Sequence, residues 1–241
     1  MSELPTIVVG VPGKWADRSA ILESIVKHSG GYLFAGMILM NVETKWSCSL
    51  EIYENDPNLR RAFEIAGGGR FSASQLDEID DHTFTLYLSC DGGSLETARA
   101  LMNAVTAMLN CGGTGVKIES TGIAHTPERW RELNASVLPI ALLDAYVTYV
   151  GGDGGFYSCG MQNIGFRDAV INAEIPPNDA ANLLFTLNAY VALENVTIGD
   201  GETFSVDETS PRYRVHKKRC EMFATDDLFH NPYGIHDLTP A

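Results

Sequence analysis

The sequence lacks the features that mark a membrane protein or a secreted protein. Its longest candidate span, Val137 to Val150, is interrupted by Pro139 and Asp144, whereas a membrane-spanning helix needs roughly 20 apolar residues. The first residues do not form the basic region of a secretory signal. We therefore expect a cytoplasmic protein that does not bind membranes.

Cysteine and histidine are sparse, and their spacing excludes the common metal motifs. The five cysteines form no Cys-x-x-Cys pair, and the six histidines show no zinc-type spacing. We expect free thiols in a reducing compartment, no metal and no other cofactor. The Gly-x-Ser-x-Gly turn is absent, and Cys159 fits the core of an alternating strand better than a nucleophile. No catalytic residue is predicted, and these absences favour a protein that is not an enzyme.

Basic residues are few. The chain has 17 Lys+Arg against 31 Asp+Glu, a formal net charge of -14, which opposes binding to nucleic acid. Five of the cations lie between Arg212 and Arg219, so the rest of the chain carries 12 against 31. Such a surface suits a basic protein partner, such as a toxin. The alternative is that the charge only keeps the chain soluble.

What is present is a regular succession of strands and helices. With 241 residues and 45% hydrophobic side chains, the chain can bury one large core or two smaller ones. Apolar periodicity, glycine stops and helix caps predict the elements. Strands are expected at residues 6–11, 32–40, 46–53, 83–89, 115–120, 145–150, 156–161, 169–175, 203–206 and 213–216, and helices at 15–28, 57–66, 95–110, 125–134 and 178–193.

Both halves of the chain follow the order strand, helix, strand or strands, helix. This order is typical of ferredoxin-like units, so we predict an α+β fold of two tandem or fused ferredoxin-like halves, with mainly antiparallel sheet and helices packed on it. A single mixed sheet with helices on one or both faces is the alternative. The polar stretch Phe71 to Asp81 indicates a boundary. The predicted domains are residues 1–81, residues 82–222, and an irregular acidic and aromatic tail at residues 223–241.

The first candidate ligand site is the glycine turn from Asp91 to Ser94, within the clearest stretch of the chain, Thr83 to Trp130. The turn leads into a helix, and the N–H groups at a helix start favour an anion. The simpler interpretation is that the glycines make the turn and Ser94 caps the helix.

The second candidate site is the turn at His125, followed by a helix start and Trp130. A histidine there suggests a small pocket with a group that titrates near neutral pH. Alternatively, His125 forms a local hydrogen bond and Trp130 packs the helix onto the sheet. If the Asp91 and His125 turns serve one ligand, both must line one cleft.

Two further motifs have both a functional and a structural interpretation. Arg212 and Arg214 share one strand face and suggest a positive patch for a carboxylate or phosphate ligand, but charges on an edge strand also prevent aggregation. The glycine cluster Gly151 to Gly155 around Asp153 is interpreted as a hairpin loop, because a calcium loop would need several oxygen ligands.

A resemblance comes from two groups of residues. They are Gly112 to Ser120 with Gly122-Ile123-Ala124-His125 and Trp130, and Asp200-Gly201-Glu202-Thr203 with Arg212-Tyr213-Arg214-Val215. Together they resemble an uncharacterised bacterial group, the 4261 family of domains of unknown function, over roughly Thr83 to Cys220. The resemblance implies a bacterial origin and no known activity, so no functional residue carries over. Genes of such families often lie near secretion or toxin loci, which by analogy suggests an immunity-type role.

From these observations we expect a non-catalytic binding protein, of the immunity or adaptor type, whose acidic surface binds a basic protein partner. The alternative is a small-ligand-binding protein or enzyme that uses the Asp91/Ser94 and His125 turns. A homo-oligomer built from paired sheet edges is a third interpretation.

Overall fold

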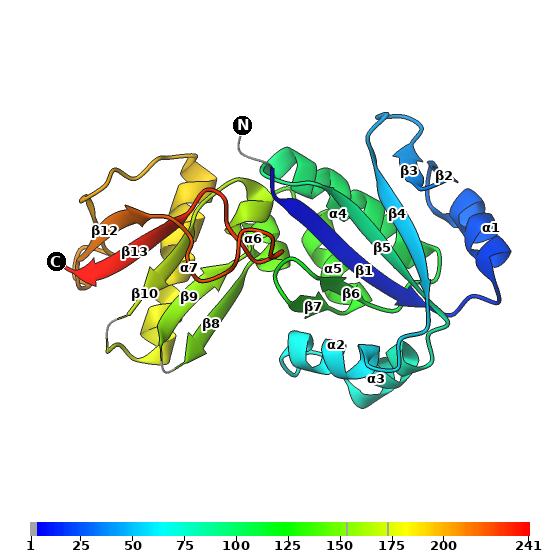
Figure 1. Cartoon of the computed structure of the whole chain (residues 1–241), viewed down its shortest axis with the longest axis horizontal. Coiled ribbons are helices and arrows are strands. Elements are labelled where there is room, and N and C mark those ends of the chain that lie inside the picture. Colours follow the sequence, from blue (N-terminus) through cyan, green and yellow to red (C-terminus); the bar gives the residue numbers. More distant parts are fainter. Residues whose placement is uncertain (1–3, 153, 173) are drawn as a thin grey trace. The chain divides into compact units, whose positions relative to one another are not determined.

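The chain forms two compact units, seen here in a computed structural model that describes residues 4–152, 154–172 and 174–241. The N-terminal unit comprises Thr6–Asp91 and Glu96–Val137. The C-terminal unit comprises Leu138–Ala241, the turn Gly92–Leu95 and the segment before Thr6. Each unit has one mainly antiparallel sheet with helices packed on it (Figure 1). The predicted α+β class is therefore confirmed, and the chain has two sheets instead of a single mixed one.

The N-terminal unit is built on a seven-stranded sheet in the order β2-β3-β4-β5-β1-β6-β7, in which all neighbours are antiparallel. Its strands are β1 (Thr6–Gly13), β2 (Tyr32–Ala35), β3 (Ile38–Asn41), β4 (Ser47–Glu54), β5 (Phe84–Asp91), β6 (Val116–Ile118) and β7 (Ile123–His125). Ile7, Val9 and Val11 alternate along β1 and are fully buried. One face of this sheet therefore forms the core of the unit.

Helices cover that face, and two more helices pack at the β7 end. The helices are α1 (Arg18–His28), α2 (Leu59–Gly67), α3 (Ala73–Asp80), α4 (Leu95–Asn110) and α5 (Pro127–Ala135). In Figure 1, α4 and α5 lie behind the sheet and its front face carries no helix over β1, β4 and β5. Ala124 points from β7 towards the cluster of α2 and α3, whereas His125 points the other way, against Trp130 of α5.

Two segments of this unit differ from the sequence prediction. The apolar run at residues 32–40 is a hairpin of β2 and β3, because Gly36 turns the chain with a φ of +64°, a conformation that suits glycine. The polar stretch after Phe71 contains α3. Its start is a capping box in which the side chains of Ser72 and Gln75 bond reciprocally to the backbone, a signal that the sequence already carries.

The predicted boundary at residues 81/82 falls inside the N-terminal unit. β5 lies between β1 and β4 and pairs with both along nearly its whole length, so it cannot begin a second half. The predicted second half combines β5, α4 and β6 of the first sheet with strands of the second sheet. Its apparent ferredoxin-like order therefore does not describe a structural unit.

The C-terminal unit has a six-stranded sheet in the order β11-β12-β13-β10-β9-β8. Its elements are α6 (Ile140–Tyr146), β8 (Thr148–Gly152), β9 (Gly155–Cys159), the 3₁₀ helix η1 (Met161–Ile164), β10 (Asp168–Ile171), α7 (Pro177–Glu194), β11 (Thr203–Phe204), β12 (Tyr213–Lys218) and β13 (Ile235–Pro240). β8 and β9 form the predicted hairpin, while Asp153 lies outside the described residues. α7 packs its leucines against Ala169, Val215 and Leu238 on one face of the sheet.

The segment predicted as an irregular tail supplies the central strand of this sheet. β13 pairs in parallel with β10 and antiparallel with β12. Ile235 and Leu238 are buried and anchor the strand, as their apolar character suggests. His236 and Asp237 are buried as well, so the strand has no alternation of apolar and polar residues by which the sequence could reveal it.

Within the described residues, none of the helices of either unit combines the length and apolar character that crossing a membrane requires.

A buried carboxyl fastens the segment before β13 to the sheet. Asp168 at the start of β10 accepts hydrogen bonds from the Ser158 hydroxyl (3.1 Å), the Met161 N–H (3.2 Å) and the Asn231 amide (2.7 Å). Asn231 also donates to the Phe166 carbonyl at 2.9 Å. Burial raises the pKa of Asp168 to about 7, against the opposing effect of these hydrogen bonds.

This raised pKa predicts a pH-dependent stability. Between its ordinary pKa and about pH 7 the native carboxyl holds a proton that the unfolded chain releases. The free energy of unfolding should therefore fall as pH rises through this window, with a slope of up to about 1.4 kcal/mol per pH unit. Urea unfolding of the wild type and of Asp168→Asn at pH 5 and pH 8 measures the difference. Asp168→Asn should lose this slope, whereas the exposed control Asp226→Asn should keep it, and equal slopes in all three proteins would contradict the assignment.

Candidate functional site

The turn from Asp91 to Ser94, which the sequence suggests as an anion site, is in close contact with other residues of the protein. The Gly93 N–H donates to the Asn163 carbonyl at 3.0 Å. Gly93 has a φ of +88°, and a Cβ built there would overlap the Tyr233 hydroxyl. The glycine therefore has a structural reason, and its N–H is not available to an anion. Ser94 directly precedes α4, where the sequence predicts a helix start.

The second predicted turn places His125 and Trp130 side by side in the core. Their ring centroids are 5.7 Å apart, both side chains are buried, and the Trp130 indole N–H donates to the Met102 carbonyl at 3.4 Å. Thr126 caps α5 through its side chain, and Pro127 occupies the first turn of the helix. This geometry agrees with the structural interpretation of the turn, in which Trp130 packs the helix onto the sheet.

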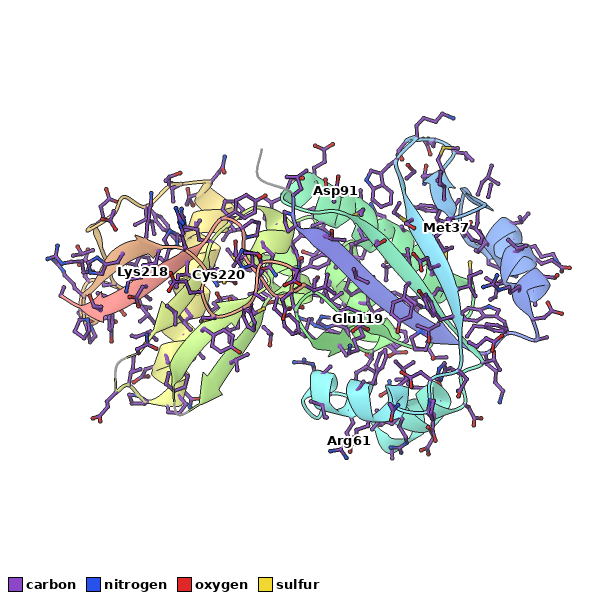
Figure 2. All side chains as sticks on the ribbon, viewed as in Figure 1. Met37, Arg61, Asp91, Glu119, Lys218 and Cys220 are labelled. Atoms are coloured by element: carbon purple, nitrogen blue, oxygen red, sulfur yellow. The ribbon has the colours of Figure 1, made fainter. Side chains whose placement is uncertain are left out.

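The sheet does not bring the Asp91 and His125 turns together. Asp91 pairs with Thr6 at the beginning of β1, and Figure 2 shows it at the end of β5. Ala124, next to His125, lies in the same row as Gly10 of β1, through β6. The two rows are four residues apart, or about 13 Å along the strands, and β5 and β7 are three strand spacings, or about 14 Å, apart. Asp91 and His125 therefore lie well apart on this sheet, which does not favour the single cleft that the enzyme interpretation requires.

The two arginines of the predicted basic patch lie at the surface of the C-terminal unit. Arg214 is exposed and donates to the Gly201 carbonyl at 3.1 Å, and the exposed Arg212 directly precedes β12. Tyr213 and Val215, which alternate with the two arginines along the chain, are buried. Exposed and buried side chains thus alternate here, as the sequence predicts for a strand. The ligand-binding role of Arg212 and Arg214 stays a prediction.

Burial makes the thiols of Cys48, Cys90 and Cys159 weak nucleophiles. All five are free. Burial raises the pKa of the Cys48 and Cys90 thiols to about 12 and raises that of Cys159 as well, so the thiols stay protonated near neutral pH. In the described part of the chain, no three His, Cys, Asp or Glu side chains gather as metal ligands would.

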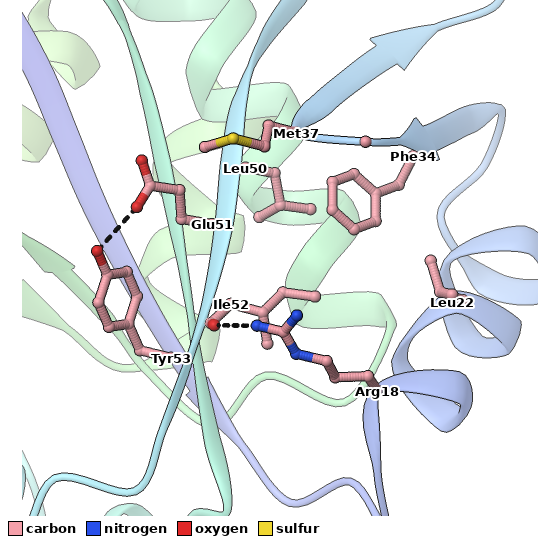
Figure 3. Close-up of a pocket in the computed structure, with 9 residues that line it drawn as sticks. Arg18, Leu22, Phe34, Met37, Leu50, Glu51, Ile52 and Tyr53 are labelled. Carbon is pink, nitrogen blue, oxygen red and sulfur yellow. Dashed lines mark hydrogen bonds between the residues drawn. The ribbon is translucent and has the colours of Figure 1, made fainter.

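A groove at the edge of the first sheet is a site that the sequence analysis does not predict. It encloses about 530 Å³ between α1, the β2–β3 hairpin and β4. Its lining residues are Arg18, Leu22, Phe34, Gly36, Met37, Leu50, Glu51, Ile52 and Tyr53 (Figure 3). Met37 is 57% exposed and Leu22 42% exposed. A contiguous apolar surface of this kind is typical of a binding site.

One side of this groove is an unpaired strand edge. β3 pairs with β4 only as far as Ser49, and the last ladder hydrogen bond runs from the Leu50 N–H to the Met37 carbonyl at 2.9 Å. Beyond that point no strand of the described chain covers the outer edge of β4. The Ile52 carbonyl on this edge accepts a hydrogen bond from the Arg18 guanidinium at 2.8 Å. Unpaired edges of this kind are templates for pairing with another chain.

The two faces beside this edge differ in character. Leu50 and Ile52 point into the groove, whereas Glu51 and Tyr53 point to the opposite face of the sheet, as Figure 3 shows. There the Tyr53 hydroxyl donates to Glu51 at 2.8 Å, and its ring packs edge-on against Tyr87 with centroids 5.4 Å apart.

The face that carries Glu51 is negatively charged. Burial, and then the negative charge of Glu119, raise the pKa of Tyr87 to about 12. The hydrogen bond to Glu51 raises the pKa of Tyr53. Glu119, labelled in Figure 2, is paired with Lys117, so these two charges offset each other, whereas Glu51 makes no ion pair with a described residue. This face therefore favours cations.

The comparisons with known proteins bear on the C-terminal unit. The family model described as Domain of unknown function (DUF4261) matches residues 157–219. The match is partial and lies within the region where the sequence resembles that family, from β9 to the end of β12. No curated protein and no solved structure matches the chain. DUF4261 carries no activity to transfer, so function is argued from the geometry alone.

The packing of the glycine turn leads to a stability prediction. Gly93→Ala should lower the free energy of unfolding by about 1–3 kcal/mol, because alanine is strained at this positive φ and its Cβ meets the Tyr233 hydroxyl. Thermal denaturation measures the change. Adding Tyr233→Phe should recover part of it by removing the hydroxyl. Gly152→Ala, where nothing lies within 4 Å of the added Cβ, is the control, and equal losses in both single variants would contradict this account.

Proposed function

We propose that the protein is a non-catalytic binding protein, of the immunity or adaptor type, that holds an extended segment of a basic protein partner in the groove beside β4. The observation that supports this function is the unpaired edge of β4 next to an apolar groove. An extended segment at such an edge continues the sheet, with main-chain hydrogen bonds supplying affinity and side-chain pockets supplying selectivity.

Side chains alternate between the two faces along β4, and this alternation determines the residue pattern that the partner segment needs. Neighbouring residues of an added strand point to opposite faces, and each lies beside the β4 residue on its own face. Alternate residues of the partner would therefore contact Ile52 in the groove, where Leu22, Phe34 and Met37 complete an apolar wall. A segment with an apolar residue at every second position fits this wall.

The charges beside the groove determine which residues fit the remaining positions of the partner segment. The other residues of the partner would lie beside Glu51 and Tyr53, on the negative face of the sheet. Asp56, just beyond the end of β4, adds a negative charge near Tyr87 on that face. Lysine or arginine at these positions would be attracted, and an acidic segment repelled. The partner segment is therefore one of alternating apolar and basic residues.

In the unbound protein, Arg18 forms a hydrogen bond to the open edge of β4. Its guanidinium occupies the Ile52 carbonyl at 2.8 Å, an acceptor that an incoming strand would need. Because Arg18 is exposed, its hydrogen bond contributes little to stability and can be exchanged for one from the partner backbone.

The topology of the sheet explains why this edge is accessible. We infer that β1, α1, β4, β5, α4 and β6 form a ferredoxin-like unit, to which the β2–β3 hairpin, α2 and α3 are additions. The order β4-β5-β1-β6 with antiparallel neighbours supports this inference. In such a unit both helices cover one face, so the other face and the outer edge of β4 are open unless an addition covers them.

Peptide binding tests the proposed function. A labelled peptide of alternating valine and lysine should bind, as measured by fluorescence anisotropy, and the matched peptide of valine and glutamate should bind more weakly. Methylation of the amide nitrogens that would face β4 should abolish binding, because it removes the donors of the ladder. Replacing Leu22 and Met37 together by glutamine should weaken binding about tenfold or more, since two apolar contacts are lost.

A matched variant controls for general effects on the surface. Ile65 of α2 is also apolar and 69% exposed but does not line the groove, so Ile65→Gln should leave binding unchanged. Glu51→Gln should narrow the difference between the lysine and glutamate peptides, most clearly at low salt. Equal binding of the two peptides, or equal weakening by Ile65→Gln, would rule out this function.

A further inference from the structure

A second pocket, within the C-terminal unit, gathers positive charge in an acidic part of the chain. It encloses about 420 Å³ between the end of α7, β12 and the segment that leads into β13. Its lining residues are Gly165, Phe166, Arg167, Val191, Val196, Thr197, Ile198, Lys217, Pro232, Tyr233 and His236. Three of these carry basic groups and none is an acid. The pocket does not involve the groove beside β4.

The register of the sheet brings two of the basic residues together. Lys217 of β12 pairs with His236 of β13, and His236 pairs with Ala169 of β10. Ala169 belongs to the core cluster under α7, so the His236 side chain points to that same face. Paired residues lie side by side on one face of a sheet, and Lys217 therefore lies beside the imidazole.

Arg167 completes the set from the segment before β10. One of its guanidinium nitrogens, Nη1, donates to the Lys218 carbonyl at 3.1 Å, which fixes the group beside the pocket. A guanidinium has five N–H donors, so one such bond leaves others for a ligand. In the described part of the chain the Lys217 ammonium makes no ion pair. The carboxylate of Asp200 bonds to the Lys217 backbone N–H and does not line the pocket.

His236 provides the independent observation that points to a ligand. The residue is only 4% exposed, and its Nδ1 atom is buried without a hydrogen-bond partner among the described residues. Burial, and then the positive charges of Arg167 and Lys217, lower its pKa to about 4, so the imidazole is neutral near pH 7 and carries one N–H. A buried polar atom without a partner is unfavourable, and an acceptor in the pocket would satisfy an Nδ1–H.

We propose that this pocket binds a small organic anion, whose carboxylate or phosphate group is held by Lys217, Arg167 and the imidazole of His236. The guanidinium and the ammonium supply charge-assisted hydrogen bonds to the oxyanion. Val191, Val196 and Ile198 form the apolar side of the pocket and contact the rest of the ligand. The site differs from the sequence-predicted patch, because Arg212 and Arg214 do not line it.

Titration with simple anions tests the proposal on the full chain. Inorganic phosphate, butyrate and the uncharged butyramide are added separately, and the imidazole signals of His236 are followed by NMR. Phosphate or butyrate should shift these signals, the tighter of the two showing which oxyanion is preferred, whereas butyramide should not. Lys217→Gln should weaken anion binding about tenfold or more, as loss of a hydrogen bond to a charged group does.

The control separates this site from a general effect of charge. Arg212→Gln removes the same charge from the same segment outside the pocket, so it should change the affinity less than twofold, as a distant screened charge does. His236→Gln removes the reporter imidazole, so its anion binding is measured by isothermal titration calorimetry beside the wild type; with folding checked by circular dichroism, it should weaken binding like Lys217→Gln. The proposal is wrong if neither anion shifts the His236 signals, if butyramide binds as well as butyrate, or if Arg212→Gln weakens binding as much as Lys217→Gln.

Discussion

The pairing of β5 between β1 and β4 is the constraint on which the N-terminal unit depends. Residues 84–91 pair with residues 6–13, so the whole chain between them must fold back before the sheet closes, at a cost in loop entropy. The pairing buries Leu86 and Leu88 in the core. It also occupies the inner edge of β4 and leaves the outer edge to the short strand β3. The groove exists because β3 begins opposite Ser49, whereas β4 continues to Glu54 without an outer neighbour among the described strands.

The same principle, a strand supplied from far away in the sequence, organises the C-terminal unit. β13 enters the centre of its sheet, and the buried cluster of Asp168 and Asn231 fixes the segment that leads to it. This segment carries Tyr233 and His236 into the basic pocket. The basic pocket therefore lies where a long-range strand pairing brings together residues that are distant in the sequence, whereas the groove is lined by residues 18–53 of consecutive elements.

Charge gives the two sites opposite preferences on one acidic chain. Beside β4, Glu51 and its neighbours favour basic groups, whereas Arg167 and Lys217 place positive charge beside His236, whose pKa is lowered by burial and then by these two charges. The formal charge of -14 describes the surface as a whole and does not reveal this local reversal. Close charges in a partly buried pocket outweigh distant ones that solvent screens.

The sequence by itself determined the α+β class, the long helices α4 and α7, and the β8–β9 hairpin, because these depend on local periodicity and turn residues. It also carried the capping box at Ser72, which lay in a stretch too polar to suggest a helix. Only the tertiary structure decided which strands are neighbours, that β13 is central, and that Asp91 and His125 are far apart. Strand pairing is a long-range choice made by the burial of whole faces, and no local pattern in this chain encodes it.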